Sequence, residues 1–313
     1  MRESMPDAAR GVLWMAMGCV FFAAMNGIIR EVSTTLDPLV VVFFRNLFGL
    51  LFVLPWLAKG GFAPRTRRLP LHLVRSLLGL VSMMSWFIAL SRMNLADAVA
   101  LSFTAPLFAT IAAVFLLGEV VRARRWSAVA VGFLGAMIIL RPGVQAITTP
   151  ALLALGSAVL MAINLAIVKM LTATEKPATI VFYMALILTP VSLIPALVVW
   201  RMPEPGELAW LAALGACGTL GQLCTARAFT LADATAVLPV DFLRLPLVAA
   251  IGYLAFGEAL DIWTAVGAAV IIGSSVYIAH REAHYRRPVT VPPFRPEAAP
   301  AEVAATRLRG ASR

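Results

Sequence analysis

The chain has 313 residues, of which 61% are hydrophobic and 13% are charged. Soluble domains carry about 45–50% apolar and about 25% charged residues, so this composition excludes an ordinary water-soluble domain. The mean hydropathy of +0.88 indicates that lipid surrounds most of the chain. The formal net charge of +10 does not indicate nucleic-acid binding, because the Lys and Arg residues stand at the ends of apolar runs and in the C-terminal tail.

Ten apolar stretches are predicted to cross the membrane as helices, since a helical span needs roughly 20 apolar residues. In chain order they cover residues 11–30, 38–58, 72–92, 96–117, 126–141, 151–171, 178–200, 208–229, 235–256 and 262–280. The connections between them are short. The sequence therefore predicts an all-α polytopic membrane protein in which ten transmembrane helices form one bundle.

The second half of the chain repeats features of the first. The string Leu-Ala-Asp-Ala occurs at 95–98 and at 231–234, and each copy precedes an apolar stretch that ends in Gly-Glu. Each half has five spans, an odd number, so the halves must cross the membrane in opposite senses, as inverted-topology repeats do. We expect a cytoplasmic N-terminus over 1–10, five-helix repeats over 11–145 and 146–282, and a disordered basic cytoplasmic tail over 283–313.

The positions of Lys and Arg predict the orientation of the spans. With the N-terminus in the cytoplasm, 19 of the 26 Lys and Arg residues fall on the cytoplasmic side and 4 on the other side. Because cytoplasmic loops carry the excess of positive residues, we expect both termini in the cytoplasm.

Two charged residues of span nine are the strongest candidates for a site, because charges within spans are costly and usually functional. Asp241 and Arg244 are three residues apart, which places them on one helical face where they can pair. Pro239 and Pro246 flank them, so this helix is predicted to be kinked or partly unwound. The pair either binds substrate, with Asp241 also a candidate for coupling to protons, or it neutralises itself and only positions span nine.

The other polar candidates for substrate binding lie in four further spans. Arg45 lies in span two, where it contacts substrate or gates the outer side, or else extends toward the membrane surface or bonds to backbone carbonyls. Asn26 and Asn164 are equivalent in the two repeats and are expected at related depths in a central cavity. Gln222 in span eight completes the set. For the asparagines the alternative is hydrogen bonding between helices.

Aromatic candidates for the cavity wall are Trp86, Tyr183 and Tyr253, together with Phe43. The three cysteines all lie in apolar stretches, and we interpret them as small packing residues that form no disulfide.

Several of these motifs carry a family resemblance. Two copies of a five-span unit, with Phe43-Phe44-Arg45 in span two and Gly118-Glu119 after span four, resemble the EamA branch of the drug/metabolite transporter (DMT) superfamily. The string from Leu238 to Pro246 is similar to a bacterial subset likened to S-adenosylmethionine uptake transporters. The resemblance covers residues 10–282 and implies ten helices around a cavity that moves a small metabolite. It also implies a location in the bacterial inner (plasma) membrane. Met184 is neutral where Arg45 would need a partner, so a symmetric two-arginine site is not implied.

The leading hypothesis is a secondary transporter of a small amphoteric or amino-acid- or nucleoside-derived metabolite, which works by alternating access and not as an enzyme. The alternatives are drug efflux or lipid-intermediate flipping on the same fold, and, less favoured, an intramembrane enzyme. The sequence has no P-loop and neither the H-E-x-x-H nor the G-x-S-x-G motif. We therefore expect no cofactor, no metal and no nucleic acid. The expected partners are a small-molecule substrate, membrane lipid and a coupling proton, for a monomer or homodimer.

Overall fold

A computed structural model of the chain describes residues 7–59, 66, 68–117, 123–141, 148–172, 175, 177–232 and 234–285. The predicted Gly118-Glu119 helix exit, Asp233 of the second Leu-Ala-Asp-Ala string and the tail beyond residue 285 lie outside these residues. Residues 1–279 form one compact unit and residues 280–313 a second, and the helix contacts described below lie within the first.

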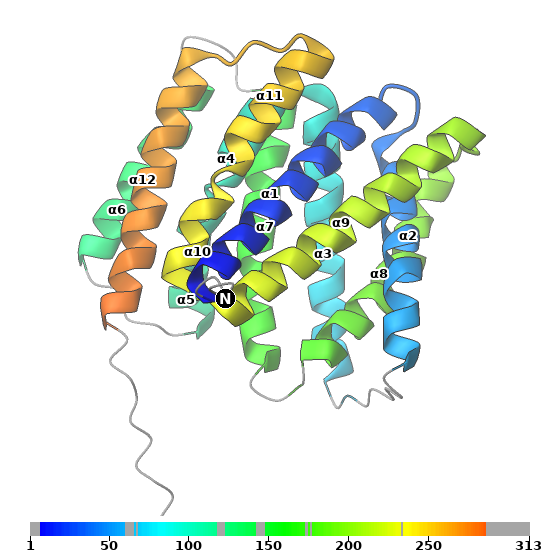
Figure 1. Cartoon of the computed structure of the whole chain (residues 1–313), viewed down its shortest axis with the longest axis horizontal. Coiled ribbons are helices and arrows are strands. Elements are labelled where there is room, and N and C mark those ends of the chain that lie inside the picture. Colours follow the sequence, from blue (N-terminus) through cyan, green and yellow to red (C-terminus); the bar gives the residue numbers. More distant parts are fainter. Residues whose placement is uncertain are drawn as a thin grey trace, which may run out of the picture. The chain divides into compact units, whose positions relative to one another are not determined.

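The described residues form helices and no strand (Figure 1). The first half holds α1 (Asp7–Val32), α2 (Pro38–Lys59), α3 (Leu69–Arg92), α4 (Leu95–Ser102), α5 (Ala105–Leu117) and α6 (Ala123–Leu140). The second half holds α7 (Thr149–Thr172), α8 (Pro177–Val198), α9 (Pro205–Leu231), α10 (Ala234–Asp241), α11 (Arg244–Phe256) and α12 (Ile262–Tyr285). In each half the fourth predicted span is divided into two helices, so the twelve helices make ten spans.

Length and composition support these spans in the described residues. Six helical stretches are long and apolar enough to cross a membrane, and they belong to α1, α3, α4–α5, α7, α9 and α10–α11. The other four spans contain shorter apolar helices within α2, α6, α8 and α12. Large apolar side chains such as Phe115, Val198 and Leu254 are exposed, as lipid contact requires. The predicted all-α polytopic fold is confirmed.

The break in span nine was predicted, and the structure places it at Phe242 and Leu243. Pro246 follows within the first turn of α11, where its missing N–H leaves the carbonyl of Phe242 without its usual helical donor. A tighter bond from Leu245 N–H to that carbonyl, 3.1 Å long, takes its place. The break is therefore a local change of backbone bonding caused by the proline.

Span four is interrupted in the same way, which the sequence analysis did not predict. Phe103 and Thr104 separate α4 from α5, and Pro106 follows. The N–H of Thr104 bonds to the carbonyl of Leu101 at 3.0 Å, and its hydroxyl donates to the same carbonyl at 2.6 Å. The two halves thus share their broken helix as well as their sequence strings.

The two halves pack on each other through matching helices. Figure 1 shows α1 beside α9 and α3 beside α7, and these are the most extensive contacts between the halves. The α11 helix packs on α1 as α5 packs on α7, and α2 packs on α8. This exchange of equivalent partners is what two repeats related by a pseudo-twofold axis produce.

The α6 and α12 helices approach closely through glycine. A Cβ added at Gly135 would lie 2.7 Å from the carbonyl oxygen of Gly267, and one added at Gly267 would lie 2.6 Å from that of Gly135. No side chain fits there, so the two backbones touch, as small residues allow in membrane bundles.

Candidate functional site

The charged pair of span nine spans the break between α10 and α11. Asp241 is the last residue of α10 and Arg244 the first of α11. The guanidinium Nη2 of Arg244 lies 2.9 Å from Oδ2 of Asp241. The Arg244 side chain remains 24% exposed and that of Asp241 30%, so this ion pair within a span is only partly buried. The predicted pairing is confirmed.

Two phenylalanine rings of the first repeat lie against Arg244 and so bring both repeats to the pair. The guanidinium carbon lies 5.5 Å from the ring centre of Phe103, at the break of span four, and 5.7 Å from that of Phe22 on α1. Phe103 also contacts Phe242 edge to face, with ring centres 4.9 Å apart. A cation over an aromatic face is attracted by the ring quadrupole. The two helix breaks therefore meet at one aromatic and charged centre.

Cys19 packs in an apolar cluster and forms no disulfide, as predicted, and it also reaches this centre. Its buried thiol on α1 donates to the carbonyl of Val240 at 3.4 Å and lies 3.9 Å from Oδ1 of Asp241. The same Val240 carbonyl also accepts the Leu243 N–H at 2.9 Å, so the thiol is its second donor at the end of α10. Nothing in the sequence pattern distinguishes Cys19 from an apolar packing residue, since its role depends on the approach of α1 to α10.

Arg45 occupies a different place, between α1, α2 and α9. Its Nη1 donates to Oδ1 of the neighbouring Asn46 at 3.2 Å. A Cβ at Gly218 on α9 would lie 3.2 Å from Arg45 Nη2 and 3.3 Å from the sulfur of Met25. Glycine on α9 thus makes room for the guanidinium, and substrate contact by Arg45 stays a prediction.

The remaining candidates are spread over the bundle. Asn26 is buried on α1, and Trp86 on α3 packs against the main apolar core. Gln222 on α9 is exposed, and Tyr253 on α11 is 66% exposed. The hydrogen bonds, ion pairs and ring contacts recorded among the described residues join none of these four to the Asp241–Arg244 pair, and their roles stay predictions.

Asn164 and Tyr183 lie near a second polar cluster, which the sequence analysis missed. His72 on α3 is fully buried, and its Nε2 lies 2.7 Å from Oε2 of Glu175, in the link between α7 and α8. The hydroxyl of Thr66 donates to the other oxygen of Glu175. The Tyr183 ring centre is 5.0 Å from that of His72. Asn164 Nδ2 donates to the Arg75 carbonyl, one helical turn along α3 from His72, at 3.3 Å.

The charge state of Glu175 follows from these contacts. Burial alone would raise the pKa of this carboxyl, whose side chain is only 7% exposed. The hydrogen bonds from Thr66 and His72, with the nearby positive charge of Arg68, outweigh burial and hold the pKa of Glu175 below its ordinary value. Glu175 is therefore a carboxylate at neutral pH.

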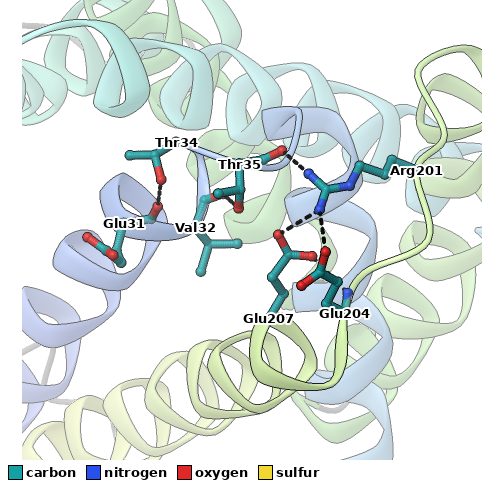
Figure 2. Close-up of polar contacts among 7 residues, drawn as sticks. All are labelled: Glu31, Val32, Thr34, Thr35, Arg201, Glu204 and Glu207. Atoms are coloured by element: carbon teal, nitrogen blue, oxygen red, sulfur yellow. Dashed lines mark hydrogen bonds and ion pairs between the residues drawn. The ribbon is translucent and has the colours of Figure 1, made fainter.

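Polar contacts also join the repeats at the opposite ends of the helices. Arg30 of α1 lies 3.2 Å from Oε1 of Glu258, just beyond α11, and Oε2 of Glu258 accepts the Leu95 N–H at 2.8 Å. In Figure 2, Arg201 donates to the Thr35 carbonyl at 2.8 Å while its other nitrogen faces Glu204 and Glu207. Through these contacts Glu258 joins α1 and α4 to α11.

A family profile and a solved structure each match most of the chain. The profile of the EamA-like transporter family matches residues 9–141 and again 148–279. A protein of known crystal structure superposes with a TM-score of 0.61 over 88% of this chain and 98% of its own, at 16% identity. At that identity the superposition supports the fold alone.

Named relatives are transporters of different compounds. The riboflavin transporter of Vibrio cholerae is 35% identical over 280 residues, covering 87% of this chain and 94% of its own. The S-adenosylmethionine uptake transporter of Rickettsia prowazekii is 31% identical over 283 residues, covering 90% and 96%. The pseudopaline exporter of Pseudomonas aeruginosa is 31% identical over 268 residues, covering 84% and 93%. The chain therefore belongs to the EamA-like transporter family of multi-pass membrane proteins, as the predicted DMT resemblance implied.

Proposed function

We propose that this protein is a secondary transporter of a small amphoteric metabolite with a planar ring, which it binds at the Asp241–Arg244 pair. The observation that carries the proposal is the partly exposed ion pair at the meeting point of the two helix breaks. Phe22 and Phe103 lie against its guanidinium, and Phe242 packs on Phe103. Carboxylate and guanidinium can each take the oppositely charged group of an amphoteric molecule, and the rings can stack on its planar part.

The relatives agree with this class of substrate without fixing a compound. Riboflavin and S-adenosylmethionine both contain a fused planar ring system together with polar or charged groups, and the proteins named for them cover nearly the whole chain. Binding at the contact between repeats also suits alternating access, since a rearrangement of either broken helix would change the walls of the site.

The proposal also includes the orientation of the chain and the membrane in which it lies. The 19-to-4 distribution of Lys and Arg supports an inner-membrane protein with both termini in the cytoplasm. Fusion of a cytoplasm-active or periplasm-active reporter after residue 285 tests it. Activity of the periplasmic reporter alone would contradict the proposed orientation.

The substrate assignment is tested by a thermal-shift screen of the purified full chain. Riboflavin, S-adenosylmethionine, amino acids and nucleosides serve as probes, with Asp241→Asn and Arg244→Ala in parallel. A ligand at 100 times its Kd stabilises the protein by about 2.7 kcal/mol, which such a screen detects. Arg227→Gln is the matched control, because Arg227 is an exposed α9 arginine that lies over Trp14.

We expect at least one probe to stabilise the wild type and the control, and to lose this effect in both span-nine variants. A probe that stabilises both variants as much as the wild type would remove the pair from the binding site. The absence of any hit would contradict the polar-metabolite assignment and favour drug efflux or lipid flipping.

A further inference from the structure

We infer that His72 and Glu175 form a proton-binding site that ties the protonation of the protein to the contact between its two repeats. The inference rests on the proposed transport function, to which it adds the coupling ion and the residues that bind it. The pair is called the His72–Glu175 bridge below.

The bridge joins elements of different repeats. His72 lies in the first turn of α3, in the first repeat, while Glu175 follows α7 in the second. The α3 helix packs on both α7 and α8, so the bridge closes the end of an interface that would separate if the repeats moved apart. A group at such an interface has a different environment in each conformation, which linkage requires of a coupling site.

The chemistry of the bridge leaves a defined position for a proton. The Glu175 carboxylate only accepts hydrogen bonds, so Nε2 of His72 carries the hydrogen that lies between them. Nδ1 of His72 is buried and has no hydrogen-bond partner among the described residues. A proton taken up from water therefore binds at Nδ1, and the imidazolium that results donates a stronger, charge-assisted bond to Glu175.

Further charged and polar groups lie around the bridge. The charged or titratable side chains described around it are Arg68 and Arg75 of the α3 region and Tyr183 of α8. Two further buried polar atoms on this seam, Ser76 Oγ and Asn164 Oδ1, have no hydrogen-bond partner among the described residues. Most buried polar atoms in proteins have a hydrogen-bond partner, so unpaired ones beside the bridge mark an unusual polar seam.

The Asp241–Arg244 pair, unlike the bridge, does not join the two repeats and offers no free position for a proton. Asp241 and Arg244 belong to the same repeat and pair across a single helix break, so protonating Asp241 would first have to disrupt an ion pair. Their mutual contact does not depend directly on the distance between the repeats. The bridge, in contrast, exists only while α3 and the α7–α8 link are together.

The direction of the effect follows from the stronger bond of the imidazolium. Protonation of His72 favours the closed bridge, and loss of the proton as the pH rises favours separation at this end of the helices. The inference is tested without any substrate by measuring the distance between spin labels at Leu73 of α3 and Met170 of α7, both of which are exposed. The labels are placed in a Cys217→Ala background, because Cys19 and Cys224 are buried.

We expect the ratio of short to long distances in lipid bilayers to fall about tenfold between pH 5.5 and pH 8.5, as loss of one charge-assisted bond would cause. His72→Gln and Glu175→Gln should each abolish this pH response. Glu204→Gln, an isosteric change at an exposed carboxylate beside Arg201, is the matched control and should keep it.

An unchanged distance distribution in the wild type, or an equal pH response in Glu175→Gln, would overturn the inference. If His72→Gln does not fold, Glu175→Gln carries the test alone, because it retains the imidazole and removes only the charge of its partner. Failure of the substrate screen would leave this result untouched, so the two proposals can fail separately.

Discussion

Removal of Arg244 is predicted to destabilise the protein more than removal of the whole charged pair. In Arg244→Ala the Asp241 carboxylate loses a cation 2.9 Å away and keeps only the weak thiol donor of Cys19, 3.9 Å from its Oδ1. Breaking a fully buried pair from one side costs about 3–5 kcal/mol. Both side chains here are about a quarter to a third exposed, so we expect a smaller loss of about 1–3 kcal/mol.

The double variant Asp241→Asn/Arg244→Ala separates the pair from its surroundings. It leaves no uncompensated charge, so its free energy of unfolding should exceed that of Arg244→Ala by about 1 kcal/mol. Reversible unfolding of the four proteins in detergent micelles provides the double-mutant cycle. A loss below about 0.5 kcal/mol for Arg244→Ala, or no recovery in the double variant, would refute the view that the ion pair stabilises the break between α10 and α11.

Three further predictions concern helix packing and the contacts at the helix ends. Gly135→Ala should lower the stability of the protein by about 1–3 kcal/mol in thermal unfolding, because its Cβ would meet a backbone oxygen of α12. Gly273→Ala is the control and should be nearly neutral, because a Cβ there would meet nothing within 4 Å. Glu258→Gln should lower thermal stability by about 1–2 kcal/mol, since the carboxylate is 11% exposed and pairs with Arg30, while Glu204→Gln, 75% exposed, should have little effect; equal losses would contradict the role of burial. Because the pKa of Glu175 is held below its ordinary 4.5, its stabilising contribution should be complete above pH 4.5 and disappear as the pH falls through the lowered pKa; Glu175→Gln should lack this acid transition in melting curves recorded from pH 6 to pH 3.

Most of the fold could be predicted from residues close together in the sequence. Apolar runs of membrane length gave the ten spans, and the repeated Leu-Ala-Asp-Ala strings gave two halves of five. The pairing of Asp241 with Arg244 followed from their spacing, and the interruption near them followed from Pro239 and Pro246. These features depend on local geometry, which a single segment contains.

The contacts between segments could not be predicted in the same way. Phe22, Phe103 and Cys19 reach the charged pair only because α1 and the α4–α5 break pack against α10 and α11, and each is an ordinary apolar residue in its own span. The interruption of span four was equally missed, although Pro106 was visible, because no charge marked it.

The sequence by itself determined that this protein lies in a membrane, that it has two inverted halves and that a charge pair is placed inside one span, because hydrophobicity, periodicity and spacing are local properties. Only the tertiary structure decided which side chains surround that pair and that His72 contacts Glu175, 103 positions further along the chain. Such contacts arise from the packing of one repeat on the other, so the sequence of either repeat alone does not specify them.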